Sequence, residues 1–403
     1  MLKSLRAVVR FKKFERDPVK RRLSKVANIE DLRRLARRRL PSGVFDYIDG
    51  AAEDERTFNR NEAGFAKIGF APRVLRGNAE IDTSTTLMGK HLPVPLVLAP
   101  TGFTRIAHSQ GELAVARSAA RAGLPYALST LGTRSIEEVA EAGDGDKWFQ
   151  VYVWKDRGLV DEMLDRAATA GYSTAVVTVD TATFGRRERD VRRGFTLPPR
   201  IGLGTIIDGI RRPGWSLDFV KAEPIMFANV TGGSVGDGSD PVSLAEYVAD
   251  QMDPGLSWED IDHFREQWPG KMTIKGIQTV ADAKIAVDRG IDAVILSNHG
   301  GRQLDDAPAP IDLLPSVADA LGGHTDIILD GGIRRGSDVV KAVSLGAKAC
   351  MFGRAYLYGL GAAGEQGVDF VLEHLVEGVE RTLSLIGCRS LDALGPEYLA
   401  DYQ

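Results

Sequence analysis

Cysteine and long apolar runs are scarce in this chain of 403 residues. Its two cysteines, Cys350 and Cys388, cannot form a disulfide framework and fit a reducing cytoplasm. No apolar run reaches the roughly 18 residues that favour a membrane-spanning helix. The first residues, MLKSLRAVVRFKKFERD, carry charges throughout, so we expect no signal peptide. The six histidines are scattered and none has ligand spacing with another His or Cys, so no metal site is expected.

Positive charge is concentrated at the start of the chain. Residues 1–39 contain fifteen Lys/Arg and four Asp/Glu, a net charge of +11, so the remainder carries −15 of the total of −4. A basic N-terminal arm, residues 1–27, is suited to an anionic membrane surface or an acidic partner, and it is equally compatible with a solvated tail. Aromatic residues do not interleave with the basic ones and the chain as a whole is acidic, so we expect no nucleic-acid binding.

A regular alternation of short apolar runs and amphipathic segments begins near residue 94. Strands that alternate with helices form parallel βαβ units, and eight of them predict a closed (β/α)8 TIM barrel, an α/β fold, within a domain spanning 28–403. An N-terminal helical extension precedes it: residues 28–49 predict two helices separated at Pro41, the first capped by Asn28. The eight runs are PLVLAP (95–100), YALST (126–130), WFQVYV (148–153), TAVVTVD (174–180), MTIKG (272–276), DAVILSNHG (292–300), DIILDGG (326–332) and ACMFG (349–353).

A long insertion, residues 181–256, follows the fourth predicted strand. Connections of this length are usually lids, interaction segments or disordered. Residues 201–215, IGLGTIIDGIRRPGW, combine an apolar stretch with arginines and a tryptophan, which suits a membrane interface. A helix packed on the barrel or on a neighbouring subunit fits the same pattern. The segments 1–27 and 201–215 thus predict peripheral contact with the inner face of the cell membrane.

Two glycine–arginine motifs predict a phosphate site. LDGGIRRGSD (329–338) follows the seventh strand, and Gly353-Arg354 follow the eighth. Gly331 and Gly332 allow backbone N–H groups to approach an anion closely, and Arg334 or Arg335 supplies charge. Phosphate-binding barrels use the loops after these two strands, although the pattern does not say what bears the phosphate.

The motif SNHGGRQLD (297–305), at the end of the sixth strand, predicts acid–base chemistry on a carboxylate substrate. His299 titrates near neutrality and can remove a proton, while Arg302 can grip a carboxylate through two parallel hydrogen bonds. Asp180, at the end of the fourth strand, could orient His299 and stabilise its imidazolium form, although spacing alone does not prove their contact.

These motifs, taken in order, resemble the family of FMN-dependent L-2-hydroxy-acid dehydrogenases and oxidases. The resemblance covers nearly the whole chain, and WSLDF (215–219) and QMDP (251–254) look most like the membrane-associated mandelate and lactate dehydrogenases. The motifs are FDYIDGAAEDERT (45–57), APTGF (99–103), FQVYVWKD (149–156), TVDTATFGRRERD (178–190), IKG (274–276), SNHGGRQLD, LDGGIRRGSDVVKA (329–342) and GRAYLYGLGAAGEQG (353–367).

The resemblance implies a substrate site and a mechanism. Tyr47 and Tyr152 would hydrogen-bond the substrate, and Arg187 and Arg302 would hold its carboxylate. His299 would be the base, partnered by Asp180. Two electrons would leave the α-carbon for the flavin, by a hydride or a carbanion route.

The resemblance also implies how FMN is held. Lys275 would lie beside the N1–C2=O edge of the flavin, where a cation stabilises the reduced ring. Ser297 would lie on the cofactor side of the sixth strand. The ring would be surrounded by Thr101, Gly102, Ser129, Gln150 and Thr178. The ribityl phosphate would be held by Asp330, Gly332, Arg334, Gly353 and Arg354.

Two positions bear on substrate and electron acceptor. Gly102 stands where oxidases of the family often have alanine, which favours a dehydrogenase that passes electrons to a quinone or a protein carrier. Leu131 stands where glycolate oxidases have tryptophan, which favours L-lactate over glycolate, unless this leucine only packs. Alternatives are a mandelate dehydrogenase, an oxygen-using oxidase or monooxygenase and, from another class, a flavin-free phosphosugar lyase or isomerase. The family often forms tetramers, so we expect a homo-oligomer.

Overall fold

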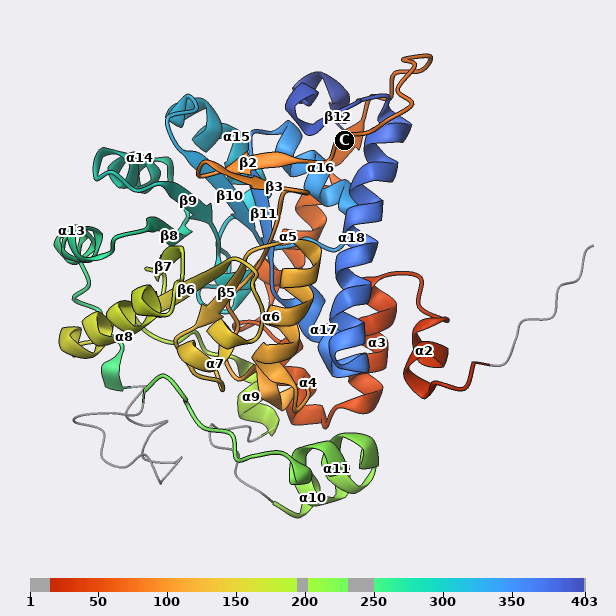
Figure 1. Ribbon diagram of the computed structural model, residues 1–403, viewed down its shortest axis with the longest axis vertical. Helices are drawn as coiled ribbons and strands as arrows, with labels where there is room; N and C mark the ends of the chain where they lie inside the picture. Colours follow the sequence, from red (N-terminus) through yellow and green to blue (C-terminus); the bar gives the residue numbers. More distant parts are fainter. Residues whose placement is uncertain (1–14, 194–201, 231–249, 402–403) are drawn as a thin grey trace, which may run out of the picture.

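The computed structural model describes residues 15–193, 202–230 and 250–401, and its centre is a closed barrel of eight parallel strands (Figure 1). Each of the eight predicted runs contains or overlaps one of these strands, which confirms the predicted TIM barrel. Around the barrel the strands follow the order β10-β11-β4-β5-β6-β7-β8-β9. Their bounds are β4 Leu96–Leu98, β5 Tyr126–Ser129, β6 Lys147–Tyr152, β7 Thr174–Thr178, β8 Lys271–Ile277, β9 Ala293–Leu296, β10 Asp326–Asp330 and β11 Ala349–Phe352.

The barrel strands are buried on both faces, which explains their unbroken apolar sequences. β5, β7 and β9 are buried at every position. Side chains that point inward, such as Trp148, Val176 and Ile295, fill the barrel interior. Side chains on the opposite face, such as Phe149 and Val177, pack with the surrounding helices in one continuous core.

Helices cover the barrel, and local capping signals mark several of their starts. The side chains of Ser135, Ser257 and Thr279 accept hydrogen bonds from backbone N–H groups in the first turns of α7, α13 and α14. The helices are α6 Gly111–Ala122, α7 Ile136–Glu141, α8 Arg157–Thr169, α13 Trp258–Gln267, α14 Val280–Asp288, α15 Pro310–Leu321, α16 Gly336–Ser344, α17 Arg354–Ala363 and the long α18 Glu365–Ile386.

The N-terminal extension folds against α17 and α18. As predicted, α3 (Ile29–Arg39) begins after Asn28, whose side chain accepts from the N–H of Asp31 at 3.0 Å, and Pro41 separates α3 from α4 (Ser42–Asp49). α5 (Arg56–Ala66) follows. Of the basic arm, residues 15–27 are described, and α2 (Pro18–Leu23) contacts α17 and α18. Residues 1–14 lie outside the described part.

Two small antiparallel sheets, which the sequence did not predict, lie outside the barrel. β1 (Ile68–Phe70) pairs with β12 (Leu399–Asp401), and β2 (Thr85–Leu87) pairs with β3 (Lys90–Leu92). The described residues also form short 3-10 helices: η1 Thr104–Ile106, η3 His299–Gly301, η4 Leu391–Ala393 and η5 Pro396–Tyr398.

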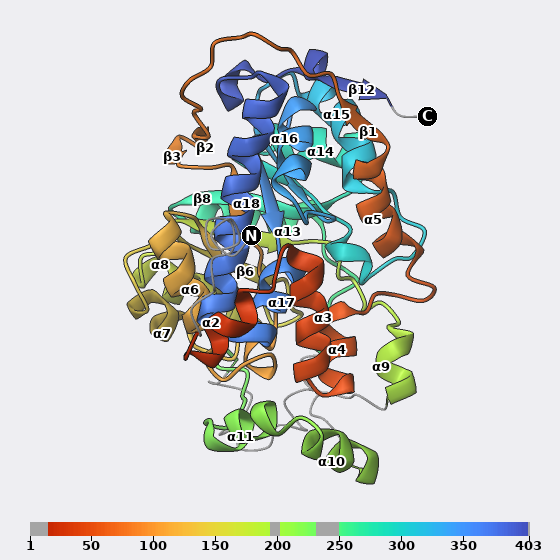
Figure 2. The same cartoon turned by 90° about the vertical axis from the view of Figure 1, so that its right-hand side faces the viewer.

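The described residues of the insertion include the helices α9 (Glu188–Arg193), α10 (Leu203–Ile210) and α11 (Pro213–Lys221). Its residues 194–201 and 231–249 lie outside the described part. Both ribbon views place α10 and α11 at one end of the molecule and β12 at the other (Figures 1 and 2), and Figure 2 shows β1 beside β12 there. Within the described ranges, no helix combines the length and the apolar character needed to cross a membrane.

Candidate active site

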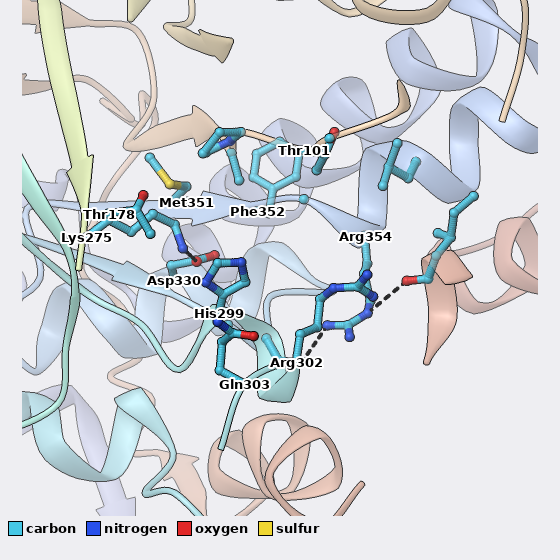
Figure 3. A pocket seen from close by; sticks show the side chains of 18 of the residues that line it. Thr101, Thr178, Lys275, His299, Arg302, Gln303, Asp330, Met351, Phe352 and Arg354 are labelled. Carbon is cyan, nitrogen blue, oxygen red and sulfur yellow. Dashed lines mark hydrogen bonds and ion pairs between the residues drawn. The ribbon is translucent and has the colours of Figure 1, made fainter. Parts of the chain in front are cut away.

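A cavity of about 310 Å³ opens at the C-terminal ends of the barrel strands. This is the end at which barrels of this kind place their chemistry. Most of the candidate residues line the cavity, and Figure 3 shows several of their side chains converging on it. They are Tyr47, Thr101, Gly102, Leu131, Gln150, Tyr152, Thr178, Arg187, Lys275, His299, Arg302, Asp330, Gly332, Arg334, Gly353 and Arg354.

His299 lies between Asp180 and Tyr152. Its Nδ1 is 2.9 Å from Oδ1 of Asp180, and its Nε2 is 3.5 Å from the Tyr152 hydroxyl. Burial alone would raise the pKa of the Asp180 carboxyl, but His299 and Lys275 outweigh that effect and hold this pKa below its usual value. The Asp180 side chain is only 5% exposed, so its carboxylate fixes the Nδ1 edge of the imidazole from the protein interior, while the Nε2 edge points toward Tyr152 at the cavity.

The backbone at His299 is strained. Its φ is 63°, in the left-handed region that residues other than glycine rarely adopt. Its N–H donates to Oγ of Ser297 at 2.5 Å, which helps to hold this conformation. Such strain costs on the order of 1–3 kcal/mol and clusters at functional sites.

Two arginines flank the ring of Tyr47. The guanidinium carbons of Arg302 and Arg187 lie 5.0 Å and 5.5 Å from its centroid. Arg302 donates from Nη1 to the carbonyl oxygens of Tyr47 and Gly50, whereas Arg187 is paired with Asp190 at 2.7 Å. Burial and the charge of Arg187 lower the pKa of Arg302. Two partly buried cations close together create a site that attracts an anion such as a carboxylate.

Lys275, Ser297 and Asp330 form a second buried cluster. Nζ of Lys275 lies 2.8 Å from Oδ2 of Asp330 and 2.9 Å from Oγ of Ser297 (Figure 3 shows the lysine and the aspartate). We expected Asp330 with the phosphate-holding groups, yet its ion pair is with Lys275, while Arg334 pairs with Glu62 at 3.0 Å. A carboxylate repels a phosphate, so this position fits contact with other parts of a cofactor better.

Two buried polar atoms on the cavity wall, Gln150 Nε2 and Thr178 Oγ1, have no hydrogen-bond partner among the described residues. Oγ of Ser129 donates to Oε1 of Gln150 at 3.0 Å, which orients the amide. Ser129 and Ser297 do not line the cavity and instead hold residues that do. Buried polar groups are normally satisfied, so these atoms fit the polar edge of a bound ring system such as FMN.

The phosphate cradle has the expected glycines and a helix N-terminus. Gly331 and Gly332 have φ of 120° and 85°, and a Cβ at Gly332 would lie 2.2 Å from the carbonyl oxygen of Asn61. α17 begins after Gly353, and no side chain caps its first N–H groups. Because Gly353 and Arg354 line the cavity, this helix N-terminus lies at the cavity wall, where it can bind an anion. Arg354 contributes charge, although its N–H groups also donate to the carbonyls of Ile48, Gly50 and Gly300. The donor set fits a phosphate.

Other lining residues escaped the sequence analysis. Asn61 lines the cavity and exchanges two amide hydrogen bonds with Asn298, at 2.9 Å and 2.7 Å. No motif marked it within amphipathic α5. Phe227 lies in the insertion, where no periodicity could place it. The apolar part of the lining includes Phe58, Phe103, Phe184, Phe227, Phe352 and Leu357.

No group of three or more His, Cys, Asp or Glu side chains able to hold a metal occurs in the part of the chain that the structure describes.

Known proteins resemble this chain over nearly its whole length. Residues 36–401 match the FMN-dependent dehydrogenase family. A Mycobacterium tuberculosis (strain ATCC 25618 / H37Rv) protein, provisionally assigned as an L-lactate dehydrogenase, is 45% identical over 99% of this chain and 95% of its own length. (S)-Mandelate dehydrogenase of Pseudomonas putida is 41% identical over 92% of this chain and 93% of its own length.

The fold agrees with this similarity. The crystal structure of the monotopic membrane protein (S)-mandelate dehydrogenase superposes with a TM-score of 0.90 at 40% identity, over 94% of this chain and 100% of that one. A flavin-free phosphosugar lyase or isomerase is therefore not supported. The chain belongs to the FMN-dependent dehydrogenase family and is a flavoprotein enzyme that oxidises a 2-hydroxy acid.

Proposed function

We propose that the enzyme oxidises L-lactate to pyruvate and passes the electrons to a quinone or a protein carrier. The observation that carries this proposal is the placement of His299, held by Asp180, beside Tyr152 and on the same cavity as Arg187 and Arg302. L-Lactate dehydrogenases are also among the relatives, including one from Caulobacter sp. (strain K31) that is 38% identical over 93% of this chain.

The substrate carboxylate would be bound by Arg187 and Arg302. The hydrogen bonds described for Arg302 come from Nη1, so Nε and Nη2 remain for a carboxylate. The hydroxyls of Tyr47 and Tyr152 would orient the substrate. His299 would take the proton through Nε2, and the Asp180 carboxylate would stabilise the resulting imidazolium.

FMN, when bound, supplies the redox chemistry by accepting the two electrons that leave the substrate. Gln150, Thr178 and Lys275 would bind its ring. Gly332, Arg334, Gly353 and Arg354 would hold its phosphate, with the N-terminus of α17 contributing partial positive charge.

L-Mandelate is the second candidate substrate. The aromatic residues Phe103 and Phe184 line the cavity and can pack against a phenyl group. The structural similarity to mandelate dehydrogenase also favours it.

An anaerobic titration of the purified flavoprotein with L-lactate, D-lactate, glycolate and L-mandelate, followed by air, tests these assignments. Bleaching by L-lactate with slow recovery in air is the expected result. Fast recovery would instead indicate an oxidase or monooxygenase. If only L-mandelate bleaches the flavin, mandelate rather than lactate is the substrate.

We further propose that α10 and α11 bind peripherally to the cytoplasmic face of the cell membrane. Their apolar side chains are exposed and accompanied by exposed Arg211 and Lys221. Arg212 and Trp215 face the body of the protein instead, donating to the carbonyls of Leu40 and Ile106. The exposed apolar residues are Ile206, Ile207, Ile210, Leu217, Phe219 and Val220.

Sedimentation with lipid vesicles tests this contact. We expect the full chain to sediment with vesicles of phosphatidylglycerol and phosphatidylcholine, and a variant with Ile206, Ile207 and Ile210 replaced by serine to remain in solution. A control variant with exposed Leu304 replaced by serine should bind like the wild type. Equal binding by the triple variant would refute the assigned surface.

A further inference from the structure

We infer that Glu223–Val230, the segment of the insertion that follows α11, forms a wall of the substrate pocket, and that Phe227 on it limits the size of the substrate side chain. We call Glu223–Val230 the return segment. The inference rests on the proposed substrate site and adds a specificity-determining residue to it.

Phe227 belongs to a row of aromatic side chains that begins at the proposed carboxylate site. Its ring centroid lies 4.4 Å from that of Phe103, at an interplanar angle of 77°, and Phe103 lies 6.3 Å from Tyr47 in the same edge-to-face manner. All three rings line the cavity. Tyr47 is the residue flanked by Arg187 and Arg302, so the row leads from the proposed place of the carboxylate to Phe227.

Leu131 completes this wall. The N–H of Phe103 donates to the carbonyl of Leu131 at 3.0 Å. The neighbouring Gly102 approaches Leu131 so closely that a Cβ on it would lie 3.0 Å from the leucine Cβ. Phe103, Leu131 and Phe227 therefore line the same cavity from the loops after β4 and β5 and from the return segment.

Arg105 holds the start of the return segment. Its side chain is 4% exposed and donates from Nη2 to the carbonyl of Glu223 at 2.5 Å and from Nη1 to that of Pro224 at 3.2 Å. Arg105 lies in η1, two residues after Phe103. The same short loop thus supplies one ring of the wall and the anchor for the segment that carries the other.

Asn229 holds the end of the segment. Its side chain is buried, accepts from the N–H of Ile136 at 2.9 Å and donates to the carbonyl of Arg134 at 3.4 Å. The N–H of Ala228 donates to the carbonyl of Gly132 at 3.3 Å. Phe227 is therefore held between two anchors and joined to the loop that carries Leu131. A wall fixed in this way discriminates by size, because it cannot move away without breaking buried hydrogen bonds.

The test compares kcat/KM for L-lactate, L-2-hydroxybutyrate, L-2-hydroxycaproate and L-mandelate in FMN-loaded protein. A pocket contact of one methylene changes discrimination by about 10–200-fold. For Phe227→Ala, we expect the kcat/KM of the larger acids, divided by the kcat/KM of L-lactate, to rise by at least about tenfold. Phe227→Leu should give a smaller shift in the same direction. Leu385→Ala, which truncates an exposed apolar side chain on α18 away from the cavity, should leave the ratio unchanged.

Asn229→Ala tests the anchor as a positioning residue. We expect the ratio of kcat/KM values to shift in the same direction as in Phe227→Ala, but by less. The shift should come mainly from changes in KM, and the FMN content should stay unchanged. Ratios within about twofold of wild type in both Phe227 variants, with FMN bound, would overturn the inference. If L-lactate reduces none of the proteins, the proposed substrate fails, but the ratios among the remaining acids still decide the role of Phe227.

Discussion

Nδ1 of His299 lies 2.9 Å from Oδ1 of Asp180, although 119 residues separate the two in the chain. The carboxylate holds Nδ1–H and leaves Nε2 toward Tyr152 and the cavity. This contact orients a histidine on a strained turn, as the proposed role of His299 as the base requires.

Replacing either partner should slow substrate oxidation without removing the cofactor. We expect His299→Ala to reduce the rate of flavin reduction by L-lactate by about 10²–10⁴-fold, because the proton acceptor is lost. Asp180→Asn should also slow it, because the imidazolium loses its counter-charge. Anaerobic stopped-flow absorbance measures both, and the FMN content of each variant is the control. Reduction of His299→Ala at the wild-type rate would contradict the assignment.

Lys275→Met should destabilise the fold as well as the site. Its partner Asp330 is buried and would keep an unpaired charge, which costs about 3–5 kcal/mol of unfolding free energy. Lys271→Met is a matched control on the same strand, because Lys271 forms an exposed pair with Asp292 that contributes about 0–1 kcal/mol. Urea unfolding compares the two variants. Equal losses would show that the buried pair has no special role.

Gly102→Ala should narrow the pocket. Its new Cβ would lie 3.0 Å from Cβ and 3.4 Å from the carbonyl oxygen of Leu131, so the leucine must shift. We expect kcat/KM to fall more for L-mandelate than for L-lactate, and the rate of reoxidation by air to change. Gly158→Ala is a suitable control, because its nearest contact would be an ordinary 3.4 Å. An unchanged substrate ratio would argue against crowding at this position.

Asp49 should make stability depend on pH. Burial alone would raise the pKa of its carboxyl, but hydrogen bonds from Arg33, Tyr358 and Arg189 outweigh burial and lower it well below the usual range. A carboxyl with a lowered pKa in the folded state contributes stability above its unfolded pKa of about 3.9 and loses it as the pH falls below that value.

The variant Asp49→Asn isolates this effect. Near neutral pH we expect it to be less stable than wild type by about 3–5 kcal/mol, because Arg33 and Arg189 lose a buried counter-charge. The difference should shrink as the pH falls below about 4. Urea midpoints across that range measure it, and a constant difference would show that the carboxylate charge is not responsible.

The sequence by itself determined the architecture of the barrel and the chemical groups at its C-terminal end. Buried parallel strands need unbroken apolar runs, helix starts need capping side chains such as Asn28 and Ser257, and cradles need residues such as Gly332. These requirements act within a few residues and can therefore be read locally. The motif around His299 identified the family in the same way.

Only the tertiary structure decided which of these groups meet. It paired Asp180 with His299 and Lys275 with Asp330, and it placed Ser129 and Ser297 behind the cavity wall. It also joined β1 to β12 and brought Phe227 to the pocket. These contacts join residues far apart in the chain, and they depend on how the closed barrel and its loops pack in space. Local periodicity or residue spacing cannot predict these contacts, because they result from the packing of the whole core.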